Sequence, residues 1–110
     1  MPIALADFRT EHFEPLLQRP FRFHRPEAPS EEPVELVLLE VSRFPNPERF
    51  PGRPPFTLLF ELREGRPPSA SLQRLTTEGF EECDLLVTRV VDPKRMRENP
   101  RGMFYEVVFA

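Results

Sequence analysis

One segment of the chain decides the fold class: Phe56-Thr57-Leu58-Leu59-Phe60-Glu61-Leu62-Arg63. Every second side chain from Phe56 to Leu62 is apolar, and most of the side chains between them are polar or charged. Successive side chains of a β-strand point to opposite faces of its sheet. The alternation therefore predicts a strand with one face buried in a core.

Five other segments have the composition of strands: 21–24, 34–43, 72–77, 83–91 and 103–110. Proline lacks the N–H that a sheet ladder needs, so the clusters of prolines between Pro26 and Pro100 mark the loops between these strands. The loops are too short for helical crossovers, which favours antiparallel pairing. We therefore predict a mainly β fold. It is a single small antiparallel β-barrel or two-sheet sandwich of about six strands, and residues 1–110 form one domain.

A short helix is expected before the first strand. Thr10 is a residue type that caps helices, and Glu11 and Glu14 would lie in the first turn, where acidic side chains are favourable. Pro15 makes this N-terminal helix short or irregular. We expect one or two turns that lie over the sheet.

The alternation also assigns faces to individual residues. In the segment 34–43, Leu36 and Leu38 are expected on one face, and Val37, Leu39 and Val41 on the other. The residues expected in the core are Phe56, Leu58, Phe60, Leu85, Val87, Val107 and Phe109.

Catalytic chemistry finds little support in the sequence, and we expect no enzyme, cofactor or metal site. Cys83 is the single cysteine, which excludes a disulfide framework and a zinc ribbon. Its neighbours Glu82 and Asp84 are acidic and would raise its pKa, so an inert, half-buried thiol is expected. His12 and His24 are the two histidines, and we interpret both as surface residues.

The net charge and the apolar runs of the chain indicate which classes of partner to expect. The formal net charge is −3, whereas binding to a phosphate backbone requires a positive surface, so we expect no nucleic acid. No apolar run approaches the ~20 residues that span a membrane, so no membrane is expected as a partner either. The expected location is the cytoplasm.

Two loops carry the candidate binding residues. The loop from Phe44 to Pro55 has twelve residues, and loops of that length in a compact domain are usually functional or disordered. The loop from Asp92 to Gly102 is locally basic, which suits an acidic protein or a phosphate backbone; the alternative is a solvated hairpin loop. Aromatic and arginine side chains are common interface anchors. The candidate protein-binding residues are Phe44, Arg49, Phe50, Arg53, Arg95 and Arg97. In the alternative interpretation, Phe44 and Phe50 fold back over one end of the barrel.

The order of several motifs resembles a small bacterial family catalogued as a domain of unknown function, whose members have about this length. The matching segments are Thr10–Leu17, Phe21–Phe23, Glu35–Val41, Pro55–Phe60, Asp84–Val87 and Tyr105–Phe109. Two features depart from that pattern. Gln18-Arg19-Pro20 stands where similar sequences often have a glycine, and the loop from Phe44 to Pro55 is longer than usual.

The resemblance implies a compact β domain without an established activity. It also implies a gene neighbourhood of phage-tail-collar-like proteins, and hence a structural or assembly role. We therefore expect a non-catalytic structural or protein-interaction module in a phage-tail-like or other multi-protein assembly, with a protein partner or a second copy of the chain. The alternative is a small-ligand-binding β-barrel, because ligand pockets of such folds lie in barrel mouths.

Overall fold

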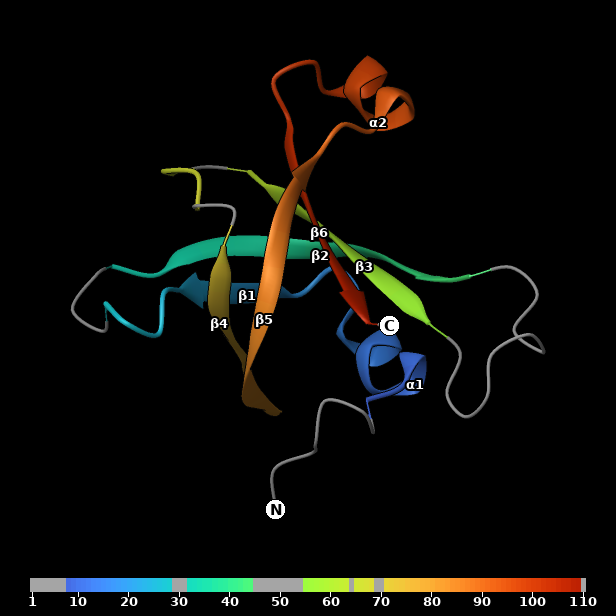
Figure 1. Ribbon diagram of the computed structural model, residues 1–110. Coiled ribbons are helices and arrows are strands. Elements are labelled where there is room, and N and C mark those ends of the chain that lie inside the picture. Colours follow the sequence, from blue (N-terminus) through green and yellow to red (C-terminus); the bar gives the residue numbers. More distant parts are fainter. Residues whose placement is uncertain (1–7, 29–31, 45–54, 64, 69–70, 110) are drawn as a thin grey trace.

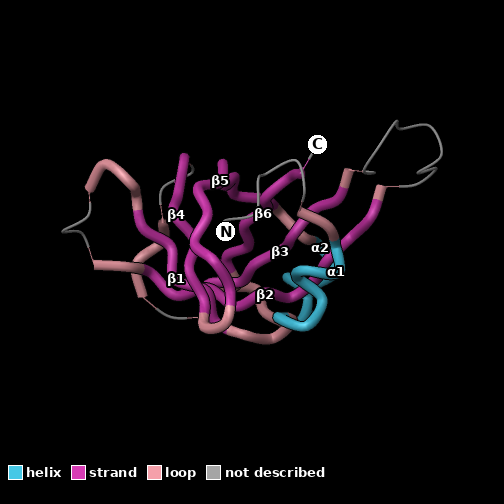
Figure 2. Tube along the Cα trace, turned by 90° about the horizontal axis from the view of Figure 1, so that it is seen from below, coloured by secondary structure: helices cyan, strands magenta, loops and turns pink. Residues whose placement is uncertain are grey.

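The computed structural model describes residues 8–28, 32–44, 55–63, 65–68 and 71–109. Its strands form one closed antiparallel barrel in the order β1-β2-β3-β6-β5-β4, so the chain is a barrel and not a two-sheet sandwich (Figure 1; Figure 2). The strands are β1 (Pro20–His24), β2 (Val34–Arg43), β3 (Phe56–Leu62), β4 (Leu72–Thr77), β5 (Phe80–Val90) and β6 (Met103–Phe109).

The six strands coincide closely with the predicted segments. The largest difference is β5, which begins at Phe80 and not at Cys83. A two-residue turn at Glu78 and Gly79 joins it to β4, so that Thr77 pairs with Phe80. Gly79 has a φ of +79°, which glycine adopts at little cost, and this conformation permits the tight turn. Ala110, the last residue of the predicted sixth strand, lies outside the described residues.

Strand β2 contains an irregularity that changes which residues face the core. Its pairing with β3 shifts between Leu38 and Glu40, as in a β-bulge. Leu36 and Leu38 are buried as predicted, but Val41 packs partly against the same core. The prediction that Val41 shares the face of Val37 and Leu39 was therefore wrong, because the extra residue reverses the alternation.

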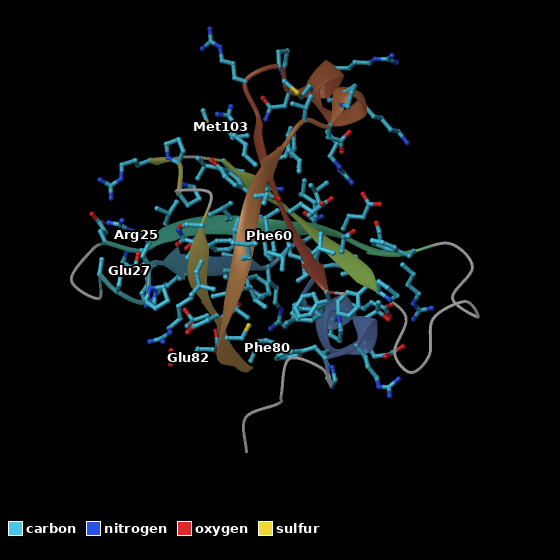
Figure 3. All side chains as sticks on the ribbon, in the orientation of Figure 1. Arg25, Glu27, Phe60, Phe80, Glu82 and Met103 are labelled. Carbon is cyan, nitrogen blue, oxygen red and sulfur yellow. The ribbon has the colours of Figure 1, made fainter. Side chains whose placement is uncertain are left out.

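The barrel interior is filled by apolar side chains, and all seven predicted core residues are buried. Aromatic rings dominate its middle. Phe60 is fully buried and lies near the centre of the molecule (Figure 3). Its ring meets those of Phe21 and Phe23 edge to face at centroid distances of 5.2 and 4.9 Å. Edge-to-face contacts of this kind add to the stabilisation that comes from burial alone.

One end of the barrel is closed by the N-terminal helix and will be called the plugged end. Helix α1 (Thr10–Phe13) continues into a 3₁₀ turn, η2 (Glu14–Leu16), in which Pro15 lies, so the predicted short and irregular helix is confirmed. Phe13 contributes a fully buried ring that contacts the rings of Phe80 and Phe109 at centroid distances of 5.1 and 5.4 Å.

The predicted cap of α1 was wrong. Arg9, in extended conformation, precedes the helix, and Thr10 is its first residue. The Thr10 hydroxyl instead accepts hydrogen bonds from Arg43 at the end of β2, at 2.8 Å from Nη2 and 3.2 Å from Nε. Arg43 also forms an ion pair with Glu11 at 3.1 Å, so these contacts attach α1 to the barrel wall.

The connection between β5 and β6 contains a helix that we had not predicted, α2 (Pro93–Glu98). Next to this connection, Phe104 of β6 is 1% exposed but is not part of the interior core. A Cβ at Gly102 would stand 2.9 Å from the Phe104 ring, so the returning chain passes close over that ring. In the described part of the chain, no helix is both long and apolar enough to cross a membrane.

Candidate functional site

Helix α2 and the residues beside it form the first candidate surface. Figure 1 shows α2 at the side of the molecule away from α1. Asp92 precedes the helix, and its Oδ1 accepts a hydrogen bond from the Arg95 backbone N–H at 3.2 Å. Proline at the first helical position suits this start, because its missing N–H would have had no partner within the helix. The pair Asp92-Pro93 is thus the local signal that could have predicted α2.

Two side-chain contacts hold α2 against the outer wall of the barrel. Arg95 Nη2 lies 3.0 Å from Glu40 Oε2 on β2, and Asn99 Nδ2 donates to Glu61 Oε2 on β3 at 3.4 Å. The hydrogen bond from Arg95 and a second from Ser42 lower the pKa of Glu40. Because these contacts reach two different strands, they orient the helix on the wall.

The remaining cations of this connection point to solvent. Lys94, Arg97 and Arg101 are all exposed, and none forms an ion pair with another described residue. Glu98 is the exposed acid among them, whereas Asp92 pairs with Arg95 at 3.2 Å. We call Val91, Lys94, Arg97 and Arg101 the hairpin tip; Val91 adds an apolar side chain that is 75% exposed.

The sequence-predicted binding residues have different positions. Arg49, Phe50 and Arg53 lie outside the described residues, so their role stays a prediction. The side chain of Phe44 is 37% exposed, and its backbone N–H donates to Pro55 O at 3.2 Å, which closes the base of that loop.

The other two predicted residues are both on α2. Arg95 is held in ion pairs within the chain, whereas Arg97 faces solvent. Arg97 shares the connection between β5 and β6 with the exposed Lys94 and Arg101, which belong to the predicted basic loop but were not among the candidate binding residues.

A second surface is an apolar row on the outer wall. Leu72 of β4 pairs with Leu86 of β5, and the register of β5 with β6 continues towards Val108. These three side chains are 47%, 65% and 49% exposed. The sequence predicts these residues only as members of strands, because their alignment on the wall depends on the registers of three strands.

A third feature is a pocket of about 320 Å³ at the end of the barrel opposite α1, where β1 ends and β2 begins. Its apolar lining consists of Phe23, Val34, Pro67 and Pro68. Its polar lining consists of His24, Arg25, Glu32, Arg66 and Gln73. We call it the mouth pocket.

A groove of about 780 Å³ lies between β1 and the turn that joins β4 to β5. Arg19 and Arg22 line it together with Glu35 and Glu78, so its formal charges balance. This groove therefore favours neither an anionic nor a cationic ligand.

Comparison with known proteins gives one family. Residues 8–109 match the domain of unknown function DUF6916. The chain belongs to this family. No curated protein and no solved structure matches it. The resemblance inferred from the order of the motifs is thereby confirmed at the level of the family.

The cysteine and the two histidines of this DUF6916 domain can be described one by one. Cys83 packs partly against the core, as predicted, and burial, assisted by Asp84 and Glu82, raises its pKa to about 12. His12 accepts a hydrogen bond at Nδ1 from the Arg9 backbone N–H at 2.9 Å, and both histidines are half-buried rather than fully on the surface. Within the described ranges, no three histidine, cysteine, aspartate or glutamate side chains gather as metal ligands would.

Proposed function

We propose that this DUF6916 domain is a non-catalytic protein-interaction module of the cytoplasm, and that its hairpin tip binds an acidic surface of another protein. Such a module would serve as a component or assembly factor of a multi-protein complex. The phage-tail-like setting implied by the sequence resemblance is one such complex.

The observation that carries the proposal is that α2 contributes no buried residue to the fold. Burial of an apolar face is what usually stabilises a helix in a protein, because short isolated helices are marginal in water. Here an aspartate cap and polar contacts to two strands hold a six-residue helix, and its outward face is basic. A role in binding accounts for a helix that the core does not require.

The positive charge of the hairpin tip and the fixed orientation of α2 both favour an acidic protein partner. The hairpin tip carries three exposed cations on a chain with a net charge of −3, so the tip is locally opposite to the rest of the molecule. Complementary charge steers association and fixes orientation. The contacts of Arg95 and Asn99 orient α2 before binding, so less conformational entropy is lost when a partner docks.

A peptide titration tests the proposal. We expect a fluorescein-labelled glutamate-rich peptide to bind the wild-type protein, with an affinity that falls as salt is added. The double variant Lys94→Ala/Arg97→Ala removes two exposed charges worth at most about 1 kcal/mol each, so binding should weaken by about tenfold. Because neither residue is buried, the free energy of unfolding should stay within about 0.5 kcal/mol of wild type.

A matched control is the double variant Arg19→Ala/Arg22→Ala, which removes the same charge from the groove beside β1 and not from the hairpin tip. Its peptide affinity should remain that of wild type. Equal losses in both double variants would show that only net charge matters, and the proposed site would be wrong. Tighter binding of a labelled DNA oligonucleotide than of the peptide would assign the hairpin tip to nucleic acid instead.

A further inference from the structure

The two ends of the barrel differ in chemistry. Aromatic rings around Phe13 fill the plugged end, whereas polar side chains line the pocket at the opposite end. Gln73 and Leu75 are two residues apart on β4 and therefore share the inner face. Leu75 belongs to the core, and Gln73 is only 2% exposed. A buried amide thus lies where the apolar core ends.

The mouth pocket lies where the apolar core gives way to the Gln73 amide. Phe23 of β1 pairs with Val34 on one side and with Leu75 on the other, so the ring and Val34 form the base next to Gln73. Pro67 and Pro68 add apolar surface from the segment that follows β3. The volume of about 320 Å³ is at the lower end of the ~300–1,000 Å³ that small-molecule sites occupy.

Cationic side chains exceed anionic ones around the pocket. Arg25 and Arg66 line it against a single carboxylate, that of Glu32. Figure 3 shows Arg25 at this end of the molecule, well away from Phe80. Arg25 and Arg66 each have a further interaction within the chain. A guanidinium has five N–H donors, so it can bind a ligand while it keeps another partner.

We propose that the mouth pocket binds a small organic carboxylate with an apolar body. The apolar body would lie against Phe23, Val34 and the two prolines. The carboxylate would accept hydrogen bonds from Arg25 and Arg66, since planar guanidinium groups match carboxylate geometry. The Gln73 amide, whose Nε2 donates to Ser71 Oγ at 3.4 Å, would offer its remaining hydrogen-bonding capacity to the ligand at the inner end of the pocket. This site is distinct from the hairpin tip and does not depend on it.

Three probes separate the parts of this recognition. Benzoate has both the charge and the apolar body, benzamide lacks the charge, and acetate lacks the body. We expect NMR titration of the full chain with benzoate to shift the amide signals of residues 23–25, 34, 66 and 73. Its dissociation constant should be at least about tenfold lower than that of benzamide or of acetate, because hydrogen bonds to charged groups and apolar burial each contribute.

Two variants locate the site. Gln73→Leu preserves side-chain size and removes the amide, and Arg25→Gln removes one charge from the rim. Each should weaken benzoate binding by at least about fivefold, while Arg19→Gln, which lies outside the pocket, should leave it unchanged. If Gln73→Leu fails to fold, benzoate binding to Arg25→Gln alone tests the location of the site. Absence of benzoate binding to the wild-type protein, equal binding of benzoate and benzamide, or unchanged binding in Arg25→Gln would overturn the proposal.

Discussion

At the scale of single residues, Phe60 shows how much one ring supports the barrel. Its side chain is fully buried and touches two other rings edge to face. We expect Phe60→Ala to lower the free energy of unfolding by about 3–5 kcal/mol, since the lost burial leaves a cavity that surrounding side chains fill only partly. Urea denaturation followed by circular dichroism measures this change. Phe44→Ala is the control at an exposed ring, and a loss within about 0.5 kcal/mol at Phe60 would contradict its role.

Cys83 makes a second prediction at this scale. Burial and the neighbouring carboxylates keep the thiol protonated at neutral pH, and only the thiolate is nucleophilic. We expect a maleimide or disulfide reagent at pH 8 to label the native protein at least about 100-fold more slowly than the denatured chain. Rapid labelling of the folded protein would show that Cys83 is reactive.

The raised pKa of Cys83 also makes the stability of the fold depend on pH, and the direction of that dependence can be predicted. The folded pKa of about 12 exceeds the usual value of about 9, so the contribution of Cys83 to stability is complete below pH 9. It is lost as the pH rises from 9 towards 12, by at most about 1.4 kcal/mol per pH unit, because only the unfolded chain ionises in that range. Urea denaturation of the wild type and of Cys83→Ala at pH 8 and pH 10.5 isolates the contribution of Cys83. If the free energy of unfolding falls equally in both proteins, Cys83 does not cause the pH dependence.

At the scale of elements, α2 is the piece whose stability depends on polar contacts. Asp92→Ala removes the side chain that accepts the Arg95 N–H, which should destabilise the helix by about 1 kcal/mol. Hydrogen exchange of amides in α2 should then accelerate about fivefold, since 1 kcal/mol corresponds to that factor. Exchange in β3 and β6 should not change. Glu98→Ala, at the last helical residue, is the control, and equal acceleration there would mean that the cap has no special role.

Strands and helix differ in how far sequence analysis could locate them. Strand β3 was found because its apolar residues alternate without interruption, a pattern that depends only on nearby residues. The α2 segment lacks an apolar stripe, since its contacts with the barrel are ionic and polar, so periodicity gave no indication of a helix. The bulge in β2 was also missed, because it is defined by pairing with β3.

At the scale of the whole molecule, β6 closes the barrel. It pairs with β3 on one side and β5 on the other, and its inner face carries Tyr105, Val107 and Phe109. A chain that ends at Gly102 should lose cooperative unfolding and its β-sheet circular dichroism, because two strands would then have exposed edges and the core would lose these side chains. Val108→Thr changes an exposed position of the same strand and should keep the barrel intact. A truncated chain that still unfolds cooperatively would contradict this dependence.

Local patterns in the sequence were enough to predict the six strands with their approximate bounds, the short N-terminal helix and seven of the residues that fill the interior. These depend on period-two alternation and on proline placement, which are local properties of the chain. The closure of the strands into a barrel and the position of α2 on its wall are visible only in the three-dimensional structure. It also brought together Gln73, Phe23 and Arg66 around one pocket, although they come from distant parts of the chain. Such neighbours depend on strand register and barrel closure, which are set by the packing of the whole core.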